Sequence, residues 1–273
     1  MELLGRVAVV TGGAGGLGRA FARALARQGV DIVIADVDLQ RMERVLADLQ
    51  RLHSGIRLLS LVTDVCSDSQ VRSLARDAVR AMGRVDLLVN AHAVLLQGRL
   101  DRITADDWHW MLDTNLLGTV RTTHALLPHL LASPAGLIVN TVPVGALLPG
   151  DSRSIPYETG FAGVAAFTQG LRAEFSSLPM AVSLFAASAS GPRLGVNARR
   201  RGLRSWFHTQ ARPLQQRVSP AAAGRAAGRL VEGIHAGDFL IIGDEADRDL
   251  ISRLRPDLFE VETAVQEALA SGS

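Results

Sequence analysis

The sequence contains no lysine, because all 29 of its positively charged residues are arginine. Any mechanism that needs a lysine ammonium group from this chain is therefore excluded. Its single cysteine, Cys66, cannot form an internal disulfide and argues against a cysteine-based zinc site, and we predict no metal site. The chain also contains only one tyrosine, Tyr157, so any phenol chemistry has a single candidate.

Long apolar segments and a strong charge are missing as well. No run of about 18 apolar residues could span a bilayer, and no charged-then-apolar leader precedes a cleavage site. The formal net charge of +2 is too small to indicate nucleic acid as a partner. We therefore expect a soluble, cytoplasmic protein that acts on a small molecule, with no membrane or nucleic-acid partner.

What the chain does contain is a glycine-rich turn between a strand and a helix. Four apolar residues, Val7–Val10, predict a buried strand, and apolar residues at helical spacing follow the turn. Glycines let the backbone approach a diphosphate, and the free N–H groups at the helix start face its negative charge. We predict that the turn holds a dinucleotide, the alternative being a tight turn without a ligand. The residues expected to bind it are Gly12, Gly16, Leu17 and Gly18.

A second predicted strand, Asp31–Ala35, ends in Asp36, about 20 residues after the glycine turn. A carboxylate at that distance is placed to accept hydrogen bonds from the adenosine ribose hydroxyls of a dinucleotide. It would also repel a 2′-phosphate. The sequence therefore predicts NAD(H) in preference to NADP(H).

Apolar runs alternate with amphipathic helical segments along the rest of the chain. The predicted strands are Val7–Val10, Asp31–Ala35, Arg57–Val62, Val85–Asn90, Gly136–Val142, Met180–Ala186 and Phe239–Ile242. The predicted helices are Leu17–Gln28, Leu39–Leu52, Ser67–Met82, Thr104–Leu131, Ile155–Ser177 and Ser219–His235. This alternation predicts an α/β fold, a doubly wound parallel sheet of about seven strands with helices on both faces and ligands beyond the carboxyl ends of its strands. We expect one domain over residues 1–243 and an acidic helical tail over residues 244–273.

The order of these motifs resembles the short-chain dehydrogenase/reductase family from about Gly5 to Gly243. The glycine turn matches the family's TGxxxGxG, and the resemblance implies a Rossmann-type sheet and hydride transfer between NAD(P) and a carbonyl or hydroxyl. Three further stretches carry the likeness: Asp64-Val65, Gly83-Arg84-Val85-Asp86-Leu87-Leu88-Val89-Asn90 and Asn115-Leu116-Leu117-Gly118. By this resemblance Asp64, Val65 and Asn90 belong to the cofactor site and Asn115 to the active site.

The family's proton-transfer groups are only partly present. The family uses a serine, a tyrosine, a lysine four residues after the tyrosine, and the asparagine. Tyr157 stands at the tyrosine position and Asn115 remains, but Pro143 replaces the serine and Phe161 replaces the lysine. A free phenol has a pKa of about 10, and Phe161 can neither lower it nor hold the nicotinamide ribose. We assign Tyr157 as a proton donor, the alternative being an inherited aromatic that packs against Phe161.

Other side chains could supply the missing groups. Thr141 at a predicted strand end, or Ser152 and Ser154 in the loop before Tyr157, could provide a hydroxyl, although ordinary strand and turn roles also fit them. His92 follows the fourth predicted strand, and with an ordinary pKa of about 6.5 it could act as an acid or base. A histidine that fills a loop by hydrogen bonding is the alternative.

The segment 193–217 contains seven arginines and no acid, together with Trp206, Phe207 and His208. In the family this region covers the substrate. Arginine beside aromatic rings suits an anionic, partly apolar ligand, whereas a solvated lid or a subunit contact is the other interpretation. The helix expected over Ile155–Ser177 carries small and apolar side chains on several sides. Such a helix is expected to be buried against another chain or the core, and we predict a homodimer or homotetramer.

Three functions are compatible with this sequence. The first is an atypical enzyme on a small hydroxy or keto metabolite, with Tyr157, Asn115 and His92 in the catalytic site. Its hydride transfer would be weak or replaced by dehydration, cyclisation or isomerisation. The second is an ordinary NAD(H)-dependent oxidoreductase with substitute catalytic groups. The third is a non-catalytic, cofactor-binding scaffold subunit.

Overall fold

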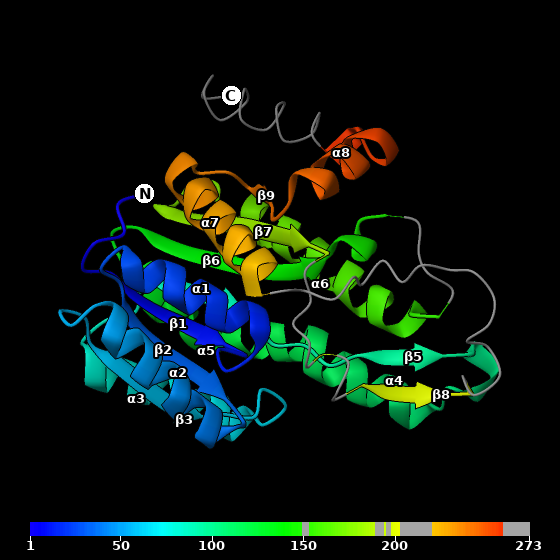
Figure 1. The fold of residues 1–273 in the computed structure, drawn as a ribbon, viewed down its shortest axis with the longest axis horizontal. Helices are drawn as coiled ribbons and strands as arrows, with labels where there is room; N and C mark the ends of the chain where they lie inside the picture. The colour runs from blue at the N-terminus through cyan, green and yellow to red at the C-terminus, as the bar shows by residue number, and fades with distance from the viewer. Residues whose placement is uncertain (149–152, 189–193, 195–197, 203–219, 259–273) are drawn as a thin grey trace.

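A seven-stranded parallel sheet forms the centre of the molecule (Figure 1). The computed structural model describes residues 1–148, 153–188, 194, 198–202 and 220–258. The strands in spatial order are β3 (Leu58–Val62), β2 (Asp31–Asp36), β1 (Val7–Thr11), β4 (Leu87–Asn90), β6 (Gly136–Pro143), β7 (Met180–Ala187) and β9 (Leu240–Ile242). This is the strand order of a doubly wound Rossmann sheet. Successive strands are added on one side of β1 as far as β3 and on its other side from β4 onward, so the switch point lies between β1 and β4. The predicted fold class is confirmed.

Helices cover both faces of the sheet because its strands are apolar on both sides. Near-continuous runs of valine, isoleucine and leucine in β1, β2 and β4 are buried. One face packs against α1 (Gly16–Arg27), α2 (Leu39–Leu52) and α7 (Pro220–Ala236). The other packs against α3 (Asp68–Met82), α5 (Gly118–Leu131) and α6 (Ile155–Glu174). The two faces therefore form two separate hydrophobic cores.

The single helix expected over Thr104–Leu131 is in fact divided in three. It consists of α4 (Ala105–Leu112), a π-helical turn η2 (Asp113–Leu117) and α5. Asn115 lies in the π-turn, and its buried side-chain amide bonds the backbone of Val94 instead of pointing along a regular helix. Helical periodicity continues across the break, so the sequence pattern alone gave no signal of it. π-Turns of this kind occur frequently at functional sites.

A small parallel sheet of β5 (Leu96–Gly98) and β8 (Arg199–Arg201) was not predicted. It lies beside α4, away from the main sheet (Figure 1). The buried carboxylate of Asp107 anchors it by accepting two 2.8 Å hydrogen bonds from Arg201. The guanidinium of Arg199 lies 3.9 Å above the ring of Trp110. Strand β8 is thus fixed by charge and stacking contacts to α4, which a three-arginine sequence does not reveal.

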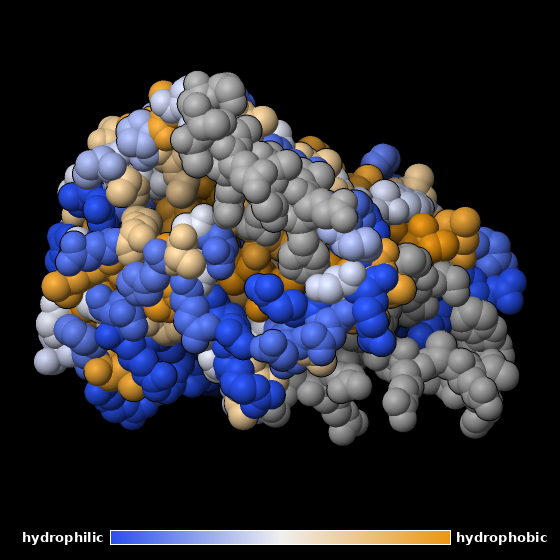
Figure 2. All heavy atoms as spheres, turned by 90° about the horizontal axis from the view of Figure 1, so that it is seen from above, coloured by the Kyte–Doolittle hydropathy of each residue, from blue (hydrophilic) through white to orange (hydrophobic). Residues whose placement is uncertain are grey.

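The start of the predicted tail, helix α8 (Glu245–Leu254), contacts β9 and the residue that follows β7. Ile251 is fully buried, and the carboxylate of Asp247 accepts hydrogen bonds from the backbone N–H and the hydroxyl of Ser188, at 2.8 and 2.5 Å. Residues 259–273 lie outside the described residues, so the division at residue 243 stays a prediction. None of the described helices is long and apolar enough to cross a bilayer. On the face drawn in Figure 2, hydrophilic residues predominate over the described surface, with apolar residues interspersed.

Candidate functional site

A cavity of about 560 Å³ lies at the carboxyl ends of the strands, at the point where the strand order reverses. It runs from Asp36 at the end of β2 past the glycine turn to Ser188 after β7. Tyr157 and Phe161 of α6 close it on one side. Parallel α/β sheets bind their ligands in this position, and the residues predicted for the site can be compared with its walls.

The glycine turn shapes the wall beneath α1. Gly12 has a φ of +62°, and a Cβ there would lie 2.6 Å from the Cα of His92. Gly12, Gly16 and Leu17 line the cavity. Gly18 does not line it, and a Cβ at Gly18 would lie 2.4 Å from the carbonyl oxygen of Gly12. Gly18 therefore serves the close approach of helix to turn, whereas the other three form the surface that a ligand meets.

The N-terminus of α1 is open to an anion. Its N-cap is Gly15, which has no side chain to bond the first N–H groups of the helix. The first four N–H groups of any helix lack partners within the helix. Because Gly16 and Leu17 line the cavity, their backbone dipoles suit a diphosphate.

Asp36 is fixed at the next strand end by two backbone groups. Its Oδ2 accepts from the N–H of Ala14 at 3.1 Å and its Oδ1 from the N–H of Asp38 at 3.2 Å. Burial raises the pKa of Asp36 despite these bonds. The carboxylate lines the cavity with lone pairs left to accept ribose hydroxyls. Its position fits the adenosine role predicted for it.

Arg41, in the first turn of α2, is a wall residue that the sequence reasoning missed. Its Nε lies 2.8 Å from Oδ2 of Asp38, and Arg41 lines the same end of the cavity as Asp36. Among the described lining residues it is the only arginine. A basic residue in the first turn after the second strand is the signal that could have found it.

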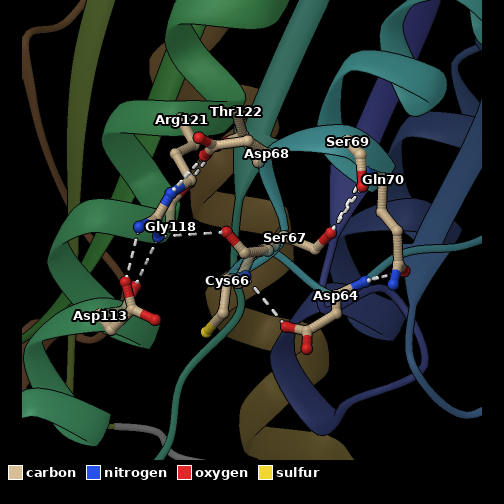
Figure 3. Close-up of polar contacts among 11 residues, drawn as sticks. Asp64, Cys66, Ser67, Asp68, Ser69, Gln70, Asp113, Gly118, Arg121 and Thr122 are labelled. Atoms are coloured by element: carbon tan, nitrogen blue, oxygen red, sulfur yellow. Dashed lines mark hydrogen bonds and ion pairs between the residues drawn. The ribbon is translucent and has the colours of Figure 1, made fainter.

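Asp64 and Val65 line the cavity from the loop between β3 and α3. Figure 3 shows Asp64 in this loop. Asp64 Oδ1 accepts from the N–H of Cys66 at 2.9 Å, which closes a tight turn. Arg121 of α5 pairs with Asp68 at 2.8 Å and with Asp113 of the π-turn at 2.7 Å. This arginine ties the start of α3, next to the loop, to the π-turn. Asp64 and Val65, two of the residues predicted from the family pattern, thus lie at the cavity wall.

Asn90 and Asn115 are buried and do not line the cavity. Asn90 Oδ1 accepts from the hydroxyl of Thr122 at 2.8 Å, and its Nδ2 donates to Oδ1 of Asn140 at 2.9 Å. The amide of Asn115 both accepts from the N–H and donates to the carbonyl of Val94, at 2.8 and 2.9 Å. Both side chains fix the backbone around the cavity, and a direct contact with a ligand stays a prediction.

His92 lines the cavity, but both ring nitrogens face hydroxyls. Its Nδ1 lies 2.6 Å from Oγ1 of Thr11, and its Nε2 lies 3.4 Å from Oγ1 of Thr119. Desolvation lowers the pKa of His92 to about 4. The imidazole is therefore neutral at neutral pH, and its contacts are those of a residue that holds a loop.

Tyr157 packs edge-to-face against Phe161, with ring centroids 4.9 Å apart and planes at 67°. Both rings are buried and line the cavity. Burial, and secondarily the charge of Glu158, raise the pKa of the Tyr157 phenol above its ordinary value. The phenol is therefore fully protonated at neutral pH. Pro143, at the family's serine position, also lines the cavity and offers no hydroxyl.

Three hydroxyls near this end differ in their partners. Ser154 Oγ is 3.4 Å from Nε2 of Gln97, and the hydroxyl of Ser188 is bonded to Asp247. Thr141 lines the cavity, and its Oγ1 is the one buried side-chain nitrogen or oxygen, within the described ranges, that has no hydrogen-bond partner. Ser152 lies outside the described residues.

The arginine-rich segment is described only in part. Arg199 and Arg201 are held by Trp110 and Asp107, so these two charges are engaged within the protein. The predicted lid residues Trp206, Phe207 and His208 lie outside the described residues. Over the part of the chain that the structure describes, no group of three or more His, Cys, Asp or Glu side chains could hold a metal ion.

The residues present fit one half of a nicotinamide dinucleotide better than the other. The open α1 N-terminus and the Asp36 carboxylate suit the diphosphate and the adenosine ribose. At the other end, the wall offers the Tyr157 phenol and the unpaired Thr141 hydroxyl, with Phe161 where a cation would stand in the family. A cofactor bound here would be held mainly by its adenylate half.

Comparisons with known proteins agree with this architecture. The family model for short chain dehydrogenase matches residues 6–192. The Thauera aromatica protein (2S)-[(R)-hydroxy(phenyl)methyl]succinyl-CoA dehydrogenase subunit BbsD is 31% identical over 186 residues, which cover 68% of this chain and 73% of the relative. A short-chain dehydrogenase/reductase from Burkholderia phymatum, solved in complex with NAD, has a TM-score of 0.79 at 29% identity and covers 96% of each chain.

An alcohol dehydrogenase from the archaeon Thermococcus sibiricus, complexed with 5-hydroxy-NADP, has a TM-score of 0.70 at 23% identity over 83% of this chain and 90% of that chain. This last likeness is one of fold. Solved structures of this fold therefore include proteins with NAD and with an NADP derivative. Because the family model covers more than half of the sequence, this chain belongs to the short-chain dehydrogenase family.

Proposed function

We propose that this protein binds NAD(H) in preference to NADP(H) and acts as an atypical short-chain dehydrogenase on a small hydroxy or keto metabolite. The observation that carries the proposal is the contrast between the two ends of the cavity. An open helix N-terminus and the Asp36 carboxylate serve the adenylate half. Tyr157 lines the other end as a buried phenol packed against Phe161.

The chemistry of the site follows from the state of Tyr157. A bound nicotinamide supplies the hydride donor or acceptor, and the chain must supply the proton. Because its pKa is raised, Tyr157 is a neutral hydrogen-bond donor to a substrate oxygen and a poor base. His92 is neutral and paired with Thr11, so in this proposal it supports the glycine turn. Asn115 supports the loop at Val94.

The rate that is lost without the family's serine and lysine decides whether ordinary or atypical turnover fits the site. The loss of one positioned transition-state donor costs about 10²- to 10³-fold in rate, and the loss of acid–base assistance costs about 10²- to 10⁴-fold. These factors do not multiply simply. Weak hydride transfer, or a non-redox dehydration, cyclisation or isomerisation assisted by the Tyr157 phenol, fits the site better than full family turnover. An ordinary oxidoreductase would need substitute groups, of which Thr141 is the available hydroxyl.

The substrate we propose is partly apolar and carries an acidic group. The cavity wall also includes Trp110, Val144 and Leu194, which suit an apolar or aromatic body. The arginines of residues 193–217 supply the charge for an acid, and the name of the Thauera relative contains a phenyl group and a succinyl-CoA. We also propose a homodimer or homotetramer, because Ala162 and Ala166 of α6 are exposed and would allow close helix packing.

A second candidate function is a non-catalytic, cofactor-binding subunit. The packing of Tyr157 on Phe161 favours it, since the ring has a structural partner without any substrate. The Thauera relative is named as a subunit of a dehydrogenase. In this case the cofactor stabilises the fold and the catalysis belongs to a partner chain.

Calorimetric titration with NADH, NAD and NADPH tests the proposal. We expect NADH and NAD to bind and NADPH to bind at least 10-fold more weakly, because Asp36 repels the 2′-phosphate. Tighter binding of NADPH than NADH contradicts the cofactor assignment. NADH oxidation with a simple ketone at rates ordinary for the family contradicts the atypical mechanism. If neither nucleotide binds, the cofactor proposal itself fails.

A further inference from the structure

The unpaired hydroxyl of Thr141 is the least explained polar group in the cavity. Its Oγ1 is buried, yet it has no hydrogen-bond partner among the described residues. A buried polar group without a partner costs free energy. Thr141 is among the residues that line the cavity, so a ligand bound there can supply the missing bond once the side chain turns its hydroxyl toward it.

The polar side chains around Thr141 are already satisfied. The preceding residue, Asn140, accepts from Asn90 at 2.9 Å and donates to Thr168 at 3.0 Å. Ser188, which follows the neighbouring strand β7, bonds Asp247. Thr11 faces His92 at 2.6 Å. Thr141 Oγ1, by contrast, has no hydrogen-bond partner.

The strand geometry places Thr141 on the face of the sheet that carries α1. Leu137 and Val139 of β6 belong to the hydrophobic core beneath α1 and α7. Side chains two residues apart along a strand point to the same face. Thr141 therefore faces the same side as the glycine turn and the α1 N-terminus.

The direction of a bound dinucleotide follows from the adenylate half. With the diphosphate at the β1–α1 turn and the adenosine ribose at Asp36 of β2, the second nucleoside extends to the opposite side of β1, over β4 and β6. Strands lie about 4.8 Å apart, so Thr141 on β6 is about 10 Å along the edge from β1. That is the side on which Tyr157 closes the cavity.

We propose that Thr141 Oγ1 hydrogen-bonds the nicotinamide nucleoside of the bound cofactor. This bond replaces part of the anchoring lost where Phe161 stands. The inference rests on the proposed function, because it requires a dinucleotide in the cavity. Thr141 is in this view a binding and positioning residue for the cofactor, while Tyr157 faces the substrate.

The test compares NADH with ADP, which lacks the nicotinamide nucleoside. Thr141→Val keeps the shape of the side chain and removes the hydroxyl, and Thr141→Ser keeps the hydroxyl as the matched control. We expect Thr141→Val to weaken NADH binding about 5- to 10-fold, the ratio for one neutral hydrogen bond, and to leave ADP binding unchanged. Thr141→Ser should bind NADH like the unmodified protein.

Thermal unfolding without ligand supplies a second readout. Thr141→Val removes an unpaired buried hydroxyl, so its melting temperature should equal or exceed that of the unmodified protein. Unchanged NADH affinity in Thr141→Val overturns the inference and leaves the cofactor site standing. Equal weakening of NADH and ADP, or an effect on substrate KM alone, also overturns it. If the unmodified protein binds neither NADH nor ADP, the proposed function fails instead.

Discussion

The two ends of the cavity differ in what their polar groups are bonded to. At the adenylate end, the Asp36 carboxylate is oriented by two backbone N–H groups, and the α1 N-terminus has no side-chain cap. These groups are oriented and still have capacity for a ligand. At the other end, the Tyr157 ring rests on Phe161 and Thr141 has no partner at all. One end is organised before a ligand arrives, whereas the other depends on the ligand for its polar contacts.

That difference teaches how a cofactor site can outlast its catalytic centre. In the proposed function, backbone groups and glycines bind the diphosphate, and these depend on the fold as a whole. Proton transfer depends on a few side chains, and Pro143 and Phe161 stand where the family pattern predicts two of them, within an intact sheet and core. Four experiments test this contrast between the two ends of the cavity.

Tyr157→Phe should have the largest effect if the second end is catalytic. Removal of the only phenol should lower turnover about 10²- to 10⁴-fold, while NADH affinity stays within twofold because the ring packing on Phe161 is kept. Steady-state kinetics on the physiological substrate and calorimetry with NADH measure the two. Unchanged turnover in this variant supports the scaffold function.

Gly12→Ala should break the first end. Gly12 has a positive φ, and the added Cβ would meet the backbone of His92 at 2.6 Å, so the turn must shift. We expect NADH affinity to fall about 100-fold, as when several backbone hydrogen bonds to a charged group are lost together. Gly170→Ala on α6 is the control, since a Cβ there meets nothing within 4 Å. Equal NADH affinity in both variants would show that the turn does not hold the cofactor.

The pH dependence of stability reports on His92, which contacts the β1 end of the glycine turn through Thr11. Burial lowers the folded-state pKa of His92 to about 4, below the ordinary 6.5. Between these two pKa values the unfolded chain therefore binds more protons than the folded chain. The contribution of neutral His92 to the free energy of unfolding is fully present above pH 6.5 and is lost as the pH falls toward 4. The expected loss from pH 7 to pH 4 is about 3 kcal/mol. Denaturant titrations at several pH values measure the free energy of unfolding of the unmodified protein and of His92→Gln. The unmodified protein should lose about 3 kcal/mol more than the variant between pH 7 and pH 4, and an equal loss in both contradicts the prediction.

Asp36→Ala should have the smallest effect of the four. Loss of the ribose acceptor should weaken NADH binding about 10-fold, near the lower limit for a hydrogen bond to a charged group. The affinity for NADPH should rise relative to that for NADH, because the variant no longer repels the 2′-phosphate and Arg41 still lines the cavity. The ratio of the two dissociation constants measures this preference. A ratio that does not change would remove Asp36 from the specificity of the site.

Most of the fold could be predicted because it is carried by local patterns. The seven strands and the glycine turn follow from apolar runs and from helical spacing, which neighbouring residues determine. The division of Thr104–Leu131 could not be predicted, since Asn115 leaves the helical pattern to bond Val94 on another segment. The β5–β8 sheet was missed for the same reason. Asp107 of α4 bonds Arg201 of β8, and the two residues are 94 positions apart in the sequence.

The sequence alone was enough to predict the α/β order, the glycine turn and the carboxylate at Asp36, and it places Pro143 and Phe161 where the family pattern predicts serine and lysine. Each of these is a matter of residue identity at a position along one chain. Only the tertiary structure decided that Asn115 bonds a backbone, that His92 is neutral, that Arg41 joins the wall and that Thr141 has no partner. Such properties depend on burial and on which distant groups come within hydrogen-bonding distance, and packing alone sets both.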